Sequence, residues 1–202
     1  KLTAAPSVLM TGAADDAAIG PVAPTAQTPV AAGWRGLRVE KSASGFGTST
    51  FTGMTIRYAG AAEPGGTGAA LTLRGVNTPL TNVQLSDNTL GLRLTEGAAP
   101  VITGASFLRN SIGMQAENAS SPTIIDSQFS QNSSAAIVNL SPSTVIQATG
   151  NWWGAGTGPT DPSGNPQGQG DPVSAGVNYA SYQTQIPLIN PSIRLATPAP
   201  YF

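Results

Sequence analysis

Residues 91–110 read GLRLTEGAAPVITGASFLRN, and residues 113–132 read GMQAENASSPTIIDSQFSQN. Both stretches carry the same signals in the same order: a small residue before an apolar-polar-apolar or similar triplet, then a proline, then a final asparagine. The offset between the two stretches is 22 residues. Because self-similarity at a fixed period of this length marks a repeat architecture, each stretch is expected to form one structural unit.

The first signal extends well beyond these two units. It occurs at Gly36-Leu37-Arg38-Val39, Ala70-Leu71-Thr72-Leu73, Gly91-Leu92-Arg93-Leu94, Gly113-Met114-Gln115-Ala116 and Ala136-Ile137-Val138-Asn139, at intervals of 34, 21, 22 and 23 residues. Alternation of this kind predicts a strand with Leu92 and Leu94 on one face and Arg93 on the other.

Prolines and asparagines give two further repeated signals, which recur with the same period as the first. The prolines open the runs Pro79-Leu80, Pro100-Val101-Ile102, Pro122-Thr123-Ile124-Ile125 and Pro142-Ser143-Thr144-Val145-Ile146. The asparagines close the runs Leu85-Ser86-Asp87-Asn88, Phe107-Leu108-Arg109-Asn110 and Phe129-Ser130-Gln131-Asn132, and Asn151 stands where a fourth is expected. Each unit is therefore predicted to contain a strand, a proline turn, a second strand and an asparagine turn. The asparagines are expected to adopt the left-handed conformation and to hydrogen-bond to one another when stacked.

These patterns predict an all-β fold, specifically a right-handed parallel β-helix (a solenoid) with about five to six coils of about 22 residues and a C-terminal capping loop. The 24 glycines and 17 prolines disfavour helix. A leucine-rich repeat has a similar period but needs a stricter leucine framework. The expected divisions are an N-terminal partial coil and long loop over 1–35, the β-helix coils over 36–151, and a C-terminal cap, final strand and proline-rich tail over 152–202.

The segment after the last repeat is the most specific part of the sequence. It contains Asn151-Trp152-Trp153-Gly154, Gly158-Pro159, Asn165-Pro166, Gly170-Asp171-Pro172-Val173-Ser174 and Val177-Asn178-Tyr179. This segment resembles the end of bacterial right-handed parallel β-helix repeat proteins of the pectin-lyase-like superfold. Similar upstream motifs are Met10-Thr11-Gly12 with Asp15-Asp16, the stretch Gly33-Trp34-Arg35-Gly36-Leu37-Arg38-Val39, and the stretch Met54-Thr55-Ile56-Arg57-Tyr58-Ala59-Gly60. The resemblance covers roughly residues 5 to 185. It implies a fold but no single function, because this architecture hosts adhesins, surface-layer parts, pectin lyases and phage tailspikes.

Two interpretations of Trp152 and Trp153 remain open. Indole rings of about 150 to 250 Å² suit a cap over the open end of the apolar column, with the loop 154–172 wrapping over them. Exposed indoles would instead form a platform on which sugar rings stack.

Composition excludes several kinds of chemistry. The chain has no cysteine and no histidine, so it lacks thiolate metal ligands, a thiol nucleophile and the commonest general base. Charged residues make up 9% and the net charge is −1, so no basic footprint for nucleic acid is present. No apolar run reaches the roughly 18 to 20 residues that span a bilayer. We expect no cofactor and assign no catalytic, cofactor-binding or metal-binding residue.

The acidic residues leave one open question. Glu40, Glu96 and Glu117 follow equivalent strands, so they are expected to stack as either a weak functional cluster or a solvated acidic turn. The loop Asp161-Pro162-Ser163-Gly164-Asn165 has a faint calcium-loop spacing, but prolines stand at the required Gly and Glu positions, so a turn is the preferred interpretation. Sequons at Asn118, Asn132 and Asn139 are interpreted as incidental. Five arginines are expected to face outward: Arg38, Arg57, Arg74, Arg93 and Arg109.

The function expected from these observations is a non-enzymatic structural or adhesive module, extracellular, within a bacterial surface layer or filament. Its expected partners are copies of itself, neighbouring β-helix subunits, or a polysaccharide, since depletion of charge is typical of interfaces. Residues 1–12 are predicted to be the tail of a strand with no polar cap before it, an edge that favours further pairing. The alternative is a polysaccharide-binding or polysaccharide-degrading protein, a lyase or glycosidase. Convergence of the three glutamates beside an exposed tryptophan would favour it.

Overall fold

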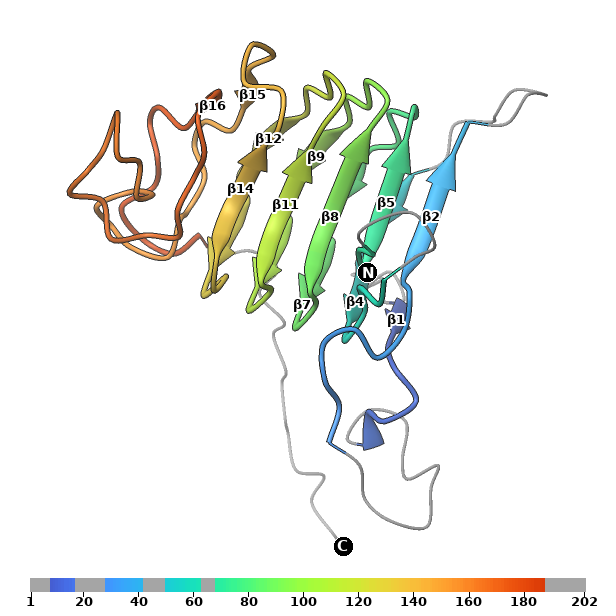
Figure 1. Ribbon diagram of the computed structural model, residues 1–202. Coiled ribbons are helices and arrows are strands. Elements are labelled where there is room, and N and C mark those ends of the chain that lie inside the picture. The colour runs from blue at the N-terminus through green and yellow to red at the C-terminus, as the bar shows by residue number, and fades with distance from the viewer. Residues whose placement is uncertain (1–7, 17–27, 42–49, 63–67, 188–202) are drawn as a thin grey trace, which may run out of the picture.

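The computed structural model describes residues 8–16, 28–41, 50–62 and 68–187, in which sixteen strands form three parallel sheets (Figure 1). The first sheet contains β1 (Val8–Met10), β4 (Met54–Arg57), β7 (Gln84–Ser86), β10 (Ser106–Leu108) and β13 (Gln128–Ser130). The second contains β2 (Leu37–Glu40), β5 (Leu71–Arg74), β8 (Leu90–Thr95), β11 (Ile112–Ala116) and β14 (Ala135–Asn139). The third contains β3 (Phe51–Thr52), β6 (Leu80–Thr81), β9 (Val101–Thr103), β12 (Thr123–Ile125), β15 (Ile146–Gln147) and β16 (Val177–Asn178). The prediction of an all-β chain of parallel strands is confirmed.

Each repeat unit contains three strands, so the prediction of two strands per unit was wrong. The chain passes through the first, second and third sheets in turn, and β7, β8 and β9 form one such unit. Only Gly104 and Ala105 separate β9 from the next strand, β10. Gly104 has a φ of 63°, which turns the chain sharply without the penalty that a side chain would add. The turn is too short to separate the two strands in the sequence pattern.

The core is a set of rows that run across the strands. In the first sheet, Ile56, Leu85, Phe107 and Phe129 lie in register and all are buried. The rings of Phe107 and Phe129 stack with their centroids 4.6 Å apart. Parallel strands at about 4.8 Å spacing bring equivalent side chains into contact, so one apolar choice per unit builds a continuous column.

The small residue before each triplet of the second sheet has a packing reason. A Cβ on Gly113 would lie 2.6 Å from the carbonyl oxygen of Ala136 in the next strand and 3.1 Å from the Phe129 ring. A side chain here would therefore collide with the backbone of β14 and crowd the Phe129 ring of the first sheet. The alternation predicted for β8 is confirmed, since Leu92 and Leu94 are fully buried whereas Arg93 is partly exposed.

The end segment adds one more partial unit beyond β14 (Figure 1). Trp152 forms a parallel bridge to Gln128 in the first sheet, and Val173 bridges Ile137 in the second. β16 pairs with β15 in the third sheet. The tryptophans therefore continue the first sheet, and the loop 154–172 is an excursion between the first and second sheets of this last unit. Of the segment 152–202 that was expected to end in a proline-rich tail, residues 188–202 lie outside the described residues.

The opposite end begins with β1, which pairs with β4. This confirms the strand expected within residues 1–12, although residues 1–7 lie outside the described part. Val8 and Leu9 of β1 are 54% and 44% exposed. In the stretch 33–39, which resembled a motif of the family, the strand begins at Leu37, and Trp34 before it donates from its Nε1 to the Arg57 carbonyl at 2.9 Å.

Candidate functional site

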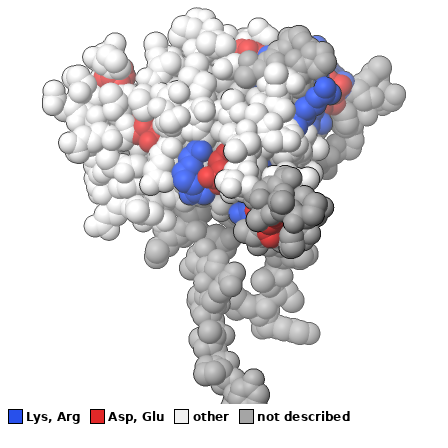
Figure 2. Space-filling view, turned by 60° about the horizontal axis from the view of Figure 1, so that its bottom comes forward, with Lys and Arg blue, Asp and Glu red and all other residues white. Residues whose placement is uncertain are grey.

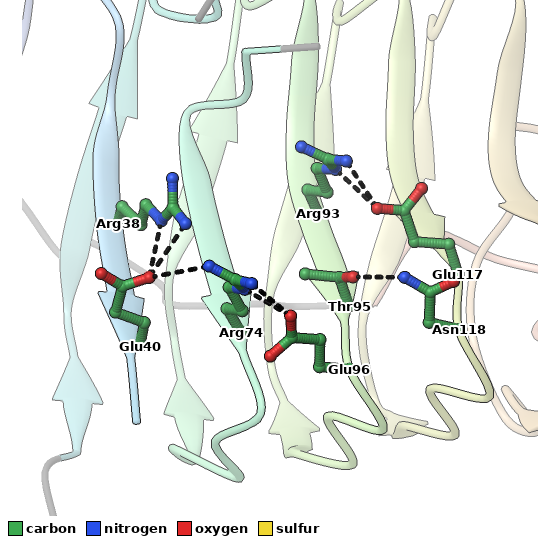
Figure 3. Close-up of polar contacts among 8 residues, drawn as sticks. All are labelled: Arg38, Glu40, Arg74, Arg93, Thr95, Glu96, Glu117 and Asn118. Carbon is green, nitrogen blue, oxygen red and sulfur yellow. Dashed lines mark hydrogen bonds and ion pairs between the residues drawn. The ribbon is translucent and has the colours of Figure 1, made fainter. Parts of the chain in front are cut away.

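The outer face of the second sheet carries the three glutamates of interest, and each faces an arginine (Figure 3). Glu40 accepts from Arg38 at 2.9 Å and lies 3.5 Å from Arg74. Arg74 also donates from its Nε to Glu96 at 2.6 Å, and this hydrogen bond is the largest cause that raises the pKa of Arg74. The chain of contacts neutralises its own charge and ties β2 and β5 to the turn after β8.

Glu117 belongs to a separate pair. It accepts from Arg93 at 2.6 Å, and the two side chains, at 16% and 22%, are less exposed than those of the Glu40 and Glu96 pairs. Beside this pair, the exposed Asn118 donates to the Thr95 hydroxyl at 3.0 Å (Figure 3). The structure thus brings Glu40 and Glu96 to one guanidinium and places Glu117 on another. Exposed ion pairs contribute about 0 to 1 kcal/mol each, so this face acts as a modest brace between strands.

No indole is exposed beside these carboxylates. Trp153 is fully buried, Trp152 is 8% exposed, and Trp34 is partly buried with its Nε1 hydrogen-bonded. These are the three tryptophans of the chain. This face therefore has no exposed indole ring on which a sugar could stack.

The predicted asparagine ladder lies at the corner between the first and second sheets. Asn88 donates from its Nδ2 to Asn110 Oδ1 at 2.9 Å, and Asn110 donates in the same way to Asn132 at 3.0 Å. All three side chains are buried. Two details of the prediction were wrong. The left-handed residue is the one before each asparagine, and Asn151 lies at another corner, where it accepts from the Ser127 backbone N–H.

Asp171 takes the fourth place in the ladder. Its Oδ2 accepts from the backbone N–H of Asn132 at 2.8 Å and from the Asn132 Nδ2 at 2.7 Å. Its Oδ1 accepts from the Gln131 N–H at 3.1 Å. Burial raises the pKa of Asp171, and the bonds from Asn132 and Gln131 oppose that shift. A carboxylate suits the end of the ladder, because it has only acceptor atoms and the groups that face it, from Asn132 and Gln131, are all donors.

The residues before the ladder positions form a second row, which sequence reasoning missed. Tyr58, Asp87, Arg109 and Gln131 occupy equivalent positions in four successive units. All four are left-handed, with φ of 59°, 61°, 53° and 62°. The sequence signal was available, since three of the four immediately precede a ladder asparagine.

This row, hereafter the corner row, lines a hollow of about 260 Å³ together with Ser111 and Ser133. Arg109 binds Asp87 through two hydrogen bonds, Nε to Oδ1 at 2.7 Å and Nη2 to Oδ2 at 2.8 Å. This geometry is the two-pronged pairing that guanidinium and carboxylate favour. The hydrogen bond that Arg109 donates to Asp87 is the largest cause that raises the pKa of Arg109.

The loop that resembled a calcium site uses its acidic oxygens for protein contacts. Asp161 Oδ1 accepts from the Ser163 N–H at 2.9 Å, and Oδ2 accepts from the Tyr179 hydroxyl at 2.8 Å. These contacts lower the pKa of Asp161, the bond from Ser163 being the largest cause. Among the described residues, no group of three or more acidic side chains is placed to hold a metal ion.

The Tyr179 contact predicts how stability depends on alkaline pH. Desolvation, and secondly the bond to Asp161, raise the pKa of Tyr179 to about 12 from its ordinary 10.0. A group whose pKa is raised by folding contributes its stability fully below its unfolded pKa and loses it as the pH rises through the folded value. We therefore expect the wild type to lose stability between pH 10 and 12 more steeply than Tyr179→Phe. Thermal unfolding at a series of pH values measures this, and parallel curves for the two proteins would contradict it.

Two of the three sequons are buried in the fold. The Asn132 amide nitrogen belongs to the ladder, and that of Asn139 donates to the carbonyls of Thr144 and Gly176. Asn118 is exposed. The folded chain therefore presents one of its three sequons at the surface, which agrees with an incidental origin for the other two.

The charged side chains are few, and on the face shown in Figure 2 the basic groups lie beside acidic ones, whereas some acidic groups stand apart on an otherwise uncharged surface. None of the described helical segments is long and apolar enough to cross a bilayer. Comparisons of the chain with models of protein families, with curated proteins and with solved structures find no match.

Proposed function

We propose that the chain winds as a right-handed parallel β-helix and serves as a non-enzymatic structural or adhesive module outside a bacterial cell, within a surface layer or filament. The resemblance of its end segment to bacterial β-helix repeat proteins supports the winding and the setting. The passage of the chain through three parallel sheets, one strand at a time, also supports a solenoid. The pairing of Glu40, Glu96 and Glu117 with arginines favours a structural role for these carboxylates over a catalytic one.

One observation carries the proposal of assembly: the third sheet presents an outer face without charge. None of its six strands contains a charged residue. Val101 and Ile125 on this face are 51% and 36% exposed. The second sheet, in contrast, carries Arg38, Arg74 and Arg93 on its strands. Depletion of charge in a β-branched, in-register surface is typical of protein contacts.

The test is self-association of the full chain. We expect the sedimentation coefficient of the wild type to rise with protein concentration, and the double variant Val101→Lys and Ile125→Lys to remain monomeric. Val138→Lys is the matched control, because Val138 lies on the outer face of the second sheet and is partly exposed there. A wild type that is monomeric at every concentration, or equal association by the double variant, would refute the assembly role.

A further inference from the structure

The corner row has an unusual composition for its backbone conformation. A residue other than glycine with positive φ is uncommon, and Asn and Asp are the types that tolerate it best. The corner between the third and first sheets follows this rule, with Asn82, Gly104 and Asp126 in the left-handed conformation. The corner row instead places Tyr58, Arg109 and Gln131 there, which are large side chains that gain nothing from the turn itself.

The fold holds these side chains along one line. Neighbouring strands lie about 4.8 Å apart, so the four positions of the row span roughly 14 Å. Ser111 and Ser133, which follow the ladder asparagines, line the same hollow. A ring, an ion pair, an amide and two hydroxyls are thus presented together by a rigid edge of the stack. Rigid presentation of convergent polar groups beside an aromatic ring is typical of a ligand site.

The charge of the hollow limits what it can bind. The Arg109 guanidinium is paired with Asp87, and the nearby Arg57, whose guanidinium lies 5.4 Å from the Tyr58 ring centroid, is paired with Asp15 at 2.6 Å. A charged ligand would have to displace one partner of these ion pairs, or its own charge would have no partner of opposite sign. The remaining groups both donate and accept hydrogen bonds, which suits a ligand rich in neutral hydroxyl groups.

The size of the hollow limits the ligand further. Pockets for drug-sized ligands have volumes of about 300 to 1,000 Å³, and this hollow of about 260 Å³ is smaller. We propose that the corner row is a binding site for one ring of a neutral saccharide, with Tyr58 against the ring and Asp87, Arg109 and Gln131 bonded to its hydroxyl groups. This inference deepens the adhesive part of the proposed function, on which it rests, by naming the chemical class that the module would adhere to.

The test is a titration of the isotope-labelled full chain with the methyl glycosides of glucose, galactose, mannose and N-acetylglucosamine, followed by NMR. We expect at least one of these neutral probes to shift the backbone amide signals of Ser111 and Ser133 in a saturable way. Glucuronate and glucosamine serve as charged probes and are expected to bind more weakly. The inference is overturned if none of the four neutral glycosides shifts these signals, or if a charged probe binds more tightly.

Gln131→Gly separates binding from folding. Glycine tolerates the φ of 62° at this position better than glutamine does, so the Tm is expected to stay the same or rise. Loss of the amide is expected to raise the Kd for the neutral glycoside about tenfold. Arg74→Ala on the second sheet is the control and should bind as the wild type does. Equal affinity of Gln131→Gly and the wild type would rule out the corner row as the site.

The two proposals can fail separately. Gln131→Gly should still self-associate, and the Val101→Lys and Ile125→Lys double variant should still bind the glycoside. Loss of glycoside binding in that double variant would show that the site depends on assembly instead of on the corner row alone.

Discussion

Asn110→Ala is expected to lower the free energy of unfolding by about 4 kcal/mol, because several buried hydrogen bonds lose a partner at once. Asn110 Oδ1 accepts from the backbone N–H of Asn88 at 3.0 Å and from its Nδ2 at 2.9 Å. Asn110 Nδ2 donates to the Leu85 carbonyl at 2.9 Å and to Asn132 Oδ1 at 3.0 Å. Alanine leaves the Asn88 backbone N–H without its acceptor, and such a buried group costs about 1 to 3 kcal/mol. It also removes one bond each from the Asn88 Nδ2, the Leu85 carbonyl and the Asn132 Oδ1, at about 0.5 to 1.5 kcal/mol each. The Asn88 Nδ2 still donates to the Ile56 carbonyl, and the Asn132 Oδ1 still accepts from the Asn110 N–H. Urea unfolding followed by circular dichroism measures the difference.

Gln128→Ala is the matched control for this prediction. Gln128 also donates one side-chain bond between neighbouring units, to the Ser106 hydroxyl at 2.9 Å, but it lies partly exposed on the outer face of the first sheet. Water replaces that bond when the amide is removed, so the loss should stay under about 1 kcal/mol. Equal effects of the two substitutions would show that the ladder is no more important than an ordinary surface contact.

The fold could be predicted largely from the sequence because the same residue types recur at equivalent positions of each unit. Apolar residues at the positions of Leu92 and Leu94 must face inward, and their recurrence gives the stacking direction. What the pattern did not show was the division between β9 and β10. A two-residue turn leaves no polar gap, so the pattern merged two strands into one segment.

The corners were predicted less well, because a shift of one residue changes which side chain forms the ladder and which residue takes the left-handed conformation. The sequence singled out Asn88, Asn110 and Asn132 correctly but assigned them the left-handed backbone of their predecessors. It also placed Asn151 in the ladder, whereas Asp171, after the loop 154–172, occupies that place. An insertion between two sheets breaks the period, and no local signal then tells which residue returns to the corner.

The contacts of the candidate site were also predicted only in part, because they too depend on the register between units. The glutamates were correctly expected at the ends of equivalent strands, but they do not share one register: Glu40 aligns through Arg74 with Thr95, so Glu96 lies one residue further on. Their arginine partners lie at varied offsets, in the same strand for Arg38 and in a neighbouring unit for Arg93. The corner row escaped notice because its members, from Tyr58 to Gln131, share no chemical type. A row of identical residues is visible in a sequence directly, whereas a row of complementary residues is visible only after its positions are aligned, here by the asparagines that follow three of them.

Trp153→Ala is expected to destabilise the protein by about 5 kcal/mol, because it removes the last layer of the aromatic column. Trp153 is fully buried, its ring stacks on Phe129 at 5.0 Å, and Tyr179 meets it edge-on at 6.5 Å. Deletion of the indole leaves a cavity between β13 and the end segment, and both Phe129 and Tyr179 lose their neighbour. The transition midpoint in urea measures this loss.

Trp153→Phe tests the reason for that loss. The Trp153 Nε1 is buried without a hydrogen-bond partner, so phenylalanine removes an unsatisfied donor while it continues the stack of Phe107 and Phe129. The smaller ring is therefore expected to cost only about 1 to 2 kcal/mol, far less than alanine. If the end segment were a separate appendage that carries an exposed sugar platform, both substitutions would leave the unfolding transition of the sheets unchanged. A large loss for alanine and a small one for phenylalanine would instead show that the end segment folds as the final layer of the same core.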